Sequence, residues 1–200
     1  MIWYAAQEGL GTALVNGLAR EAVPPVAKDG HLLIEARSHE VFGRKVSYNP
    51  LSRRVFIFDG TLTWPTPART ITDGFGPRVL RGQDDFHSGI DFPVRAGTEV
   101  RAVLPGRLHL VGYDPGGFGN FVVLDHGDGL FSLYAHLSTA EAPDQVAAGQ
   151  VIGLSGATGK AFGPHLHFAL YATGAYFPLT RDGIYNKEAA VDPWPLFERS

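Results

Sequence analysis

Short runs of apolar or alternating residues, each ended by a turn that contains Gly or Pro, follow one another along the chain beyond residue 97. Runs of this length and period predict β-strands, and Gly127-Asp128-Gly129 is typical of a hairpin turn. The runs are 98–102, 106–111, 120–125, 130–135 and 151–154. The pattern therefore predicts an all-β or β-rich fold, in which an antiparallel sheet carries long loops that form a groove.

Composition limits the partners and cofactors that such a fold could have. The net charge is −3 and no polybasic cluster is present, so nothing indicates binding to nucleic acid. The chain has no cysteine, so a metal could be held only by His and carboxylate side chains. No run reaches the roughly 18 apolar residues of a membrane span. The length of 200 residues fits one main core, with or without an appendage.

The N-terminal third has a different pattern. Residues 1–21 carry apolar side chains at a spacing compatible with a short amphipathic helix, and polar interruptions distinguish them from a secretion signal. Two short strands are expected over 31–36 and 40–42, and a stronger one over 54–58. We expect a junction at Thr66-Pro67, which divides the chain into an appendage of helix and small β segments, 1–66, and a main domain, 67–200.

Two histidines one residue apart, His165 and His167, lie in an apolar run that follows Gly163-Pro164. In a β-strand alternate side chains leave the same face, so both imidazoles are expected to point the same way. Such a pair suits a metal site or an acid–base pair, although a single buried His is more often a hydrogen-bonded core residue. The interpretation therefore depends on the other histidines.

His87 and Asp91 are four residues apart in a segment that Gly89 and Pro93 make extended. Imidazole and carboxylate are both zinc ligands, and a catalytic zinc site uses three protein ligands. His87, Asp91 and one histidine of the later pair would complete such a set. His136 ends the run 130–135, where a structural role is as plausible as a functional one.

Several motifs in order resemble the LytM/lysostaphin-like zinc endopeptidases of family M23, which cut peptides of bacterial peptidoglycan. The resemblance extends over residues 71–197. It implies that His87, Asp91 and His167 bind one zinc ion per chain, and that His136 and His165 form the catalytic pair beside it. The matching stretches are Ile71–Arg78, Phe86–Asp91, Gly119–Gly127, Tyr134–Ser138, Gly153–Gly159 and Gly163–Phe168.

Two further residues are weaker candidates for contact with substrate or with a developing oxyanion. Arg78, in the motif Gly-Phe-Gly-Pro-Arg, could offer donors to either, or could be an ordinary surface residue. Tyr134 lies two residues from His136, so its hydroxyl could face the site if the strand alternates regularly. A role as a core aromatic is the alternative for Tyr134.

The function expected from the resemblance is hydrolysis of stem peptides or cross-bridges of peptidoglycan by a metal-activated water. A non-catalytic module that binds the cell wall or activates another hydrolase is one alternative, and a zinc peptidase aimed at Gly-rich proteins is another. The substrate implies a periplasmic or secreted protein, although no signal peptide is visible in the sequence. Residues 1–66 could act as a latch, bind the wall or brace the sheet.

Overall fold

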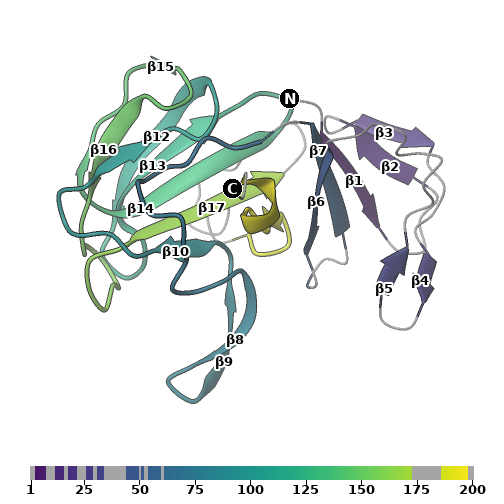
Figure 1. Cartoon of the computed structure of the whole chain (residues 1–200), viewed down its shortest axis with the longest axis horizontal. Helices are drawn as coiled ribbons and strands as arrows, with labels where there is room; N and C mark the ends of the chain where they lie inside the picture. The colour runs from purple at the N-terminus through teal and green to yellow at the C-terminus, as the bar shows by residue number, and fades with distance from the viewer. Residues whose placement is uncertain are drawn as a thin grey trace.

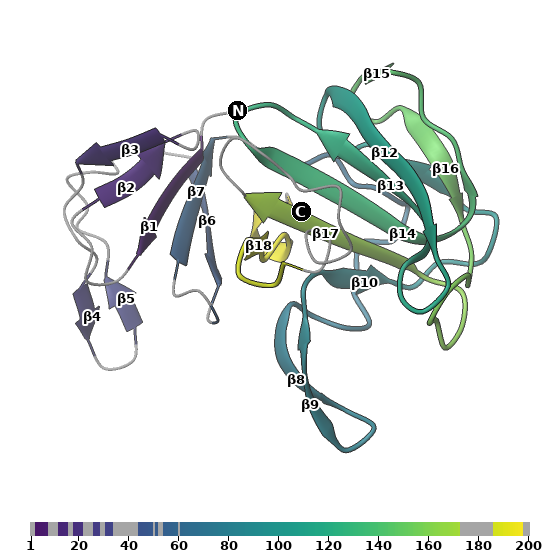
Figure 2. The ribbon, with the colours of Figure 1, turned by 180° about the vertical axis from the view of Figure 1, so that it is seen from behind.

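A computed structural model shows a protein built from β-sheets (Figures 1 and 2). The structure describes residues 61–172 and 186–197 in full; before residue 61 it describes Leu51 and the backbone of strands between residues 3 and 59. Every pairing between its strands is antiparallel. The predicted antiparallel, β-rich fold is therefore confirmed. Within the described part of the chain, no helix has the length and apolar character needed to cross a membrane.

The largest sheet has nine strands, and its long strands are those that the alternating runs predict. The main path runs in the order β10, β17, β14, β13, β12 and β15, and β11, β16 and β18 pair off this path. Their bounds are β10 Ile90–Phe92, β11 Glu99–Arg101, β12 Gly106–Asp114, β13 Gly119–Asp125, β14 Leu130–Ala140, β15 Gln145–Val146, β16 Val151–Ser155, β17 Leu166–Ala172 and β18 Ala190–Val191. A hairpin formed by β8 (Gly76–Leu80) and β9 (Gln83–His87) projects from this body (Figure 1).

Alternate residues of β17 divide the core into two clusters. Leu166, Phe168 and Leu170 belong to the larger cluster, together with Tyr134 of β14. Ala169 and Tyr171 belong to the smaller cluster, on the opposite face of the strand. All residues of β17 are buried, because neighbouring structure covers both faces. His167 shares its face with the smaller cluster.

The predicted N-terminal helix is wrong. Residues in this region form three antiparallel strands, β1 (Trp3–Gln7), β2 (Thr12–Val15) and β3 (Leu18–Glu21). The glycines at positions 9, 11 and 17 fall between these strands, and Asn16-Gly17 is the dipeptide most typical of a two-residue hairpin loop. An apolar spacing compatible with a helix was thus less informative than the turn residues that interrupt it.

The strand predicted over 54–58 is confirmed as β7 (Arg54–Asp59), which pairs with β1 and with β6 (Arg44–Asn49). A separate pair consists of β4 (Val26–Lys28) and β5 (His31–Leu33). The strand predicted over 40–42 lies outside the described residues. The five-stranded N-terminal sheet has the order β3, β2, β1, β7 and β6 (Figure 2).

The segment that joins the two sheets packs with the main core. Leu62 forms a bridge with Phe197, next to the short 3-10 helix η2 (Trp194–Leu196). The indole of Trp64 stacks on the Phe197 ring, with 4.6 Å between ring centroids. The division of the chain at residues 66 and 67 stays a prediction, and these contacts show that packing on the main core begins a few residues earlier.

Candidate metal centre and active site

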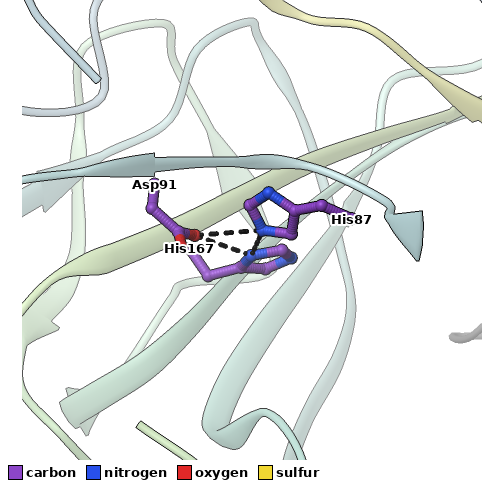
Figure 3. A group of neighbouring side chains, drawn as sticks. All are labelled: His87, Asp91 and His167. Carbon is purple, nitrogen blue, oxygen red and sulfur yellow. Dashed lines mark hydrogen bonds and ion pairs between the residues drawn. The ribbon is translucent and has the colours of Figure 1, made fainter. Parts of the chain in front are cut away.

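Three side chains from two distant parts of the sequence meet at the edge of the main sheet (Figure 3). Nε2 of His87 lies 3.0 Å from Nδ1 of His167 and 3.3 Å from Oδ1 of Asp91. Nδ1 of His167 lies 3.0 Å from the same carboxylate oxygen. The three atoms therefore form a nearly equilateral triangle, and all three side chains point into one space.

The sheet register explains how these residues come together. Asp91 of β10 is directly opposite His167 of β17, so their side chains leave the same face of the sheet. His87 ends β9, and Ser88-Gly89 separates it from β10. A Cβ at Gly89 would overlap the carbonyl oxygen of Phe168 and lie 2.9 Å from Cε1 of His167. The glycine lets the His87 segment pack directly against β17.

The tautomer of His87 is set by the main chain of the segment that precedes the hairpin. Its Nδ1 lies 2.8 Å from the carbonyl oxygen of Gly74, which can only accept, so Nδ1 carries the proton. Nε2 then presents a lone pair to the cluster. A carbonyl that orients the far nitrogen of a histidine in this way is the usual arrangement around a metal ligand.

The geometry and charge of this group fit a small divalent cation. Four tetrahedral ligands at about 2.0–2.1 Å from zinc are separated from one another by about 3.3 Å, close to the observed spacing of 3.0 to 3.3 Å. Although burial opposes ionisation, hydrogen bonds with His167 and His87 hold the pKa of Asp91 well below its usual value. Burial also lowers the pKa of His167, which favours the neutral ring that a metal needs.

Two more histidines, His136 and His165, lie beside this group. Their ring centroids are 4.6 Å apart, and His136 is 6.0 Å from the ring of His167. Each directs Nδ1 at a backbone carbonyl oxygen, that of Thr158 for His136 and that of Gly163 for His165, both at 2.9 Å. Both rings therefore carry the proton on Nδ1 and keep Nε2 as the basic nitrogen.

The surroundings of these two histidines suit proton transfer. Nε2 of His165 lies 3.8 Å from Oδ2 of Asp91, which places it at the metal-binding group. Burial, together with the nearby His167, lowers the pKa of His136 to about 4. His136 is therefore neutral at pH 7 and can accept a proton there.

Arg78 lies on β8, where its guanidinium is held by two carboxylates. It forms ion pairs with Asp73 and with Asp85, the latter at 2.9 Å. Although partial burial opposes ionisation, the hydrogen bond from Arg78 lowers the pKa of Asp85. The backbone of Asp73 in turn pairs with that of Asp91 in an isolated antiparallel β-bridge. Arg78 thus braces the segment that orients His87, and its contact with substrate stays a prediction.

Tyr134 does not face the candidate site, which corrects the expectation from strand alternation. The side chain is fully buried in the larger core cluster. Its hydroxyl accepts a hydrogen bond from Val103 N at 2.9 Å and lies 3.1 Å from Oγ of Ser132. Regular alternation fails because His136 has a φ of +60°, and the pairing of β13 with β14 shifts register nearby. The alternative role, a core aromatic, matches this placement.

The hairpin of β8 and β9 also contacts the loop that precedes His165. The guanidinium of Arg81, at the hairpin tip, lies 4.6 Å from the centre of the Phe162 ring. His87 ends the hairpin, and His165 follows Phe162 by three residues. Two segments that each lead to a histidine of the site are therefore connected by a cation–π contact.

Sequence reasoning missed the carbonyl groups that set the histidine tautomers. They belong to Gly74, Thr158 and Gly163, all inside the motifs on which the resemblance depends. The side-chain pattern contains no signal for them, because any residue has a carbonyl group. The glycines in these motifs were the only sequence feature indicating that the backbone approaches other groups closely there.

A partly buried carboxylate and two buried imidazoles around one space, with two more basic imidazoles beside them, make the donor set of a metallohydrolase. The model of peptidase family M23 matches residues 85–179, which include all five residues. The catalytic domain of the antimicrobial peptidase lysostaphin from Staphylococcus simulans is 35% identical, with a TM-score of 0.53 over 63% of this chain and 90% of that domain. The chain belongs to peptidase family M23.

Other relatives extend the comparison. Peptidoglycan DD-endopeptidase ShyA from Vibrio cholerae is 40% identical over 109 residues, which are 52% of this chain and 25% of ShyA. A zinc-containing peptidase from Vibrio cholerae is 26% identical, with a TM-score of 0.53 over 84% of this chain and 44% of that structure. The part of each curated relative that this chain matches is only 20% to 33% of that relative's length.

Proposed function

We propose that the protein is a zinc-dependent endopeptidase that hydrolyses peptide bonds of bacterial peptidoglycan. The observation that carries this proposal is the triangle of His87, Asp91 and His167 ligand atoms, 3.0 to 3.3 Å apart, beside two histidines with unprotonated Nε2. The zinc content of the related Vibrio cholerae peptidase supports the choice of metal. The name of ShyA supports the choice of substrate.

His87, Asp91 and His167 would hold the ion. When bound, zinc supplies Lewis-acid chemistry: it polarises a carbonyl group and lowers the pKa of water towards about 7. His136 can take a proton from the attacking water on Nε2, because its ring is neutral at pH 7. His136 can then pass that proton to the departing amine, and His165, as imidazolium, can stabilise the oxyanion. The main-chain carbonyls of Thr158 and Gly163 keep both rings in the required tautomer.

The substrate class sets the expected location. A peptidoglycan endopeptidase meets its substrate in the cell envelope or outside the cell, so we propose a periplasmic or secreted protein. Stem peptides or cross-bridges would lie against the loops around His87 and His165. Residues 1–66 would belong to an N-terminal appendage, and residues 67–200 to the peptidase domain.

The metal assignment is tested by zinc analysis of purified variants. His87→Ala and His167→Ala should each lose the bound zinc, because a three-ligand site that loses one ligand holds the ion poorly. His126→Asn is the matched control: His126 bonds with Pro105 and Ser132, away from the metal-binding group, so this variant should keep zinc. Full zinc content in His167→Ala would contradict the ligand set.

Turnover is tested on purified sacculi from one Gram-negative and one Gram-positive source. Mass spectrometry should detect new peptide amines and carboxylates after incubation with the zinc-loaded protein. His136→Ala should keep zinc and lose about 10²- to 10⁴-fold in rate, the usual contribution of a general base. Absence of cleavage in both sacculi, with zinc bound, would contradict the proposed activity and favour a non-catalytic module.

A further inference from the structure

The backbone of β14 is distorted at one buried residue of the candidate site. Among the described residues, three that are not glycine have a positive φ: Arg81, Asp128 and His136. Arg81 and Asp128 lie in hairpin turns, whereas His136 lies inside a strand and is only 7% exposed. A left-handed conformation costs such a residue about 1 kcal/mol or more, so the surroundings must hold it there.

One residue, Thr158, contacts His136 through its main chain and the following residue, Leu137, through its side chain. The Thr158 carbonyl oxygen accepts the Nδ1 proton of His136 at 2.9 Å. The Thr158 hydroxyl donates to the carbonyl oxygen of Leu137 at 2.8 Å. Both the imidazole ring and the backbone one residue beyond it are therefore held by the same residue.

Two neighbours complete this set of contacts. Asn120 donates from Nδ2 to the same Leu137 carbonyl at 3.0 Å, and its backbone N–H donates to the Thr158 hydroxyl at 2.9 Å. The backbone N–H of His136 donates to the carbonyl of Phe118 at 2.8 Å. The Leu137 carbonyl thus receives two side-chain donors, which compensates for the break in the regular pairing of β13 with β14.

Glycines allow Thr158 to come this close. A Cβ at Gly119, where φ is +62°, would overlap the hydroxyl and carbonyl atoms of Thr158. A Cβ at Gly159, where φ is +71°, would overlap the backbone nitrogen of Gly119. Lys160 N also donates to the carbonyl of Gly117 at 2.8 Å, so the two loops are joined along their backbones.

We infer that Thr158 is a positioning residue for His136: its hydroxyl holds the left-handed backbone that turns the imidazole towards the metal-binding group, and its carbonyl selects the Nδ1-protonated tautomer. This inference rests on the proposed function, because the role of a positioned base presumes the hydrolytic reaction. Thr158 itself touches neither metal nor substrate.

The test compares Thr158→Val, which keeps the shape and removes the hydroxyl, with Thr158→Ser, which retains it. Thr98→Val is the matched control, because the Thr98 hydroxyl also donates to a backbone carbonyl, that of Arg95, at 2.8 Å. Zinc content, kcat and KM are measured on sacculi-derived peptides. Nitrogen-15 NMR of the imidazoles reports the tautomer of His136, whose signal is assigned by its loss in His136→Gln.

Thr158→Val should lower kcat by about tenfold to a hundredfold, the range that displacement of a catalytic group by about 1 Å produces, with KM and zinc content unchanged. Without the hydroxyl bond to Leu137, the Thr158 carbonyl is no longer held against His136, so the NMR spectrum should show the loss of the single Nδ1-protonated tautomer. Thr158→Ser and Thr98→Val should retain both kcat and tautomer. If Thr158→Val does not fold, Asn120→Ala removes the other donor to Leu137 and should produce the same two changes.

An unchanged tautomer and kcat in Thr158→Val would overturn the inference, as would an equal loss in Thr158→Ser. The NMR measurement separates this inference from the proposed function. If the unsubstituted protein cleaves no peptide, a tautomer lost only in Thr158→Val would still support the positioning role. A tautomer retained in that variant would overturn it.

Discussion

Tyr134 and His136 stand two residues apart on one strand, yet they serve different parts of the molecule. The Tyr134 hydroxyl accepts from the buried backbone N–H of Val103. Tyr134→Phe leaves that N–H without its partner, so we expect a loss of about 1–3 kcal/mol in the free energy of unfolding. Zinc content and kcat/KM should change by less than about twofold. Urea unfolding and turnover on sacculi provide the two measurements.

The opposite pattern would contradict this placement of Tyr134. A large loss of kcat with unchanged unfolding free energy would return the hydroxyl to the active site. Ser132→Ala leaves the Val103 contact intact but removes the hydroxyl that bonds both Tyr134 and His126, so its cost is not a measure of the Tyr134 contact alone.

At the same scale, the sequence predicted the members of the metal-binding group better than their surroundings. The spacing of His87 and Asp91 and the alternation of two later histidines left the third ligand open, and the resemblance to family M23 selected His167; the structure brings these three side chains together. Of the two roles that the sequence left open for Tyr134, the core role holds, because one residue with a positive φ breaks the alternation that would align Tyr134 with His136. A left-handed conformation at a histidine has no signature in residue type, so only the structure could reveal it.

Among the elements, the turn between β9 and β10 has a strict steric requirement. Gly89→Ala would place a methyl group against the Phe168 carbonyl and the His167 ring. We expect overpacking to cost about 1–3 kcal/mol in unfolding free energy, and the displaced His87 and His167 to bind zinc more weakly. Thermal unfolding and zinc titration measure both effects.

Gly163→Ala is the matched control for the unfolding measurement. A Cβ there meets nothing within 4 Å, and its φ lies outside the left-handed region. The substitution should leave stability unchanged or raise it slightly, because alanine restricts the unfolded chain. Equal destabilisation by both alanines would show that the Gly89 contact does not limit the turn.

Strand existence in the main sheet was predictable because its runs are short, alternating and punctuated by turn residues. The first three strands, β1 to β3, were not, since apolar spacing over residues 1–21 fits more than one period. Asn16-Gly17 was the better signal, and it lies between β2 and β3. The order of the strands in either sheet could not be read from the sequence, because it depends on contacts between distant segments.

For the whole molecule, burial of histidines links stability to pH. Burial lowers the pKa of His126, His136 and His167, so each ring is neutral in the folded protein at pH values where the unfolded chain would protonate it. The unfolded state then binds more protons, and the free energy of unfolding falls as pH falls below about 6.5. Above that pH the contribution of these groups is fully present.

His136 allows a quantitative version of this prediction, since its pKa falls from the ordinary value of 6.5 to about 4. Linkage then gives a loss of about 1 kcal/mol of unfolding free energy between pH 7.5 and pH 5.5 from this residue alone. Glutamine in His136→Gln cannot titrate, so the unfolding free energy of this variant should depend less steeply on pH over the same interval.

Urea unfolding with a chelator present, at pH 7.5, 6.5 and 5.5, measures the folding equilibrium without competition from metal. If both proteins lose stability equally, His136 is protonated as readily in the folded state as in the unfolded one, which would contradict the lowered pKa that burial gives it.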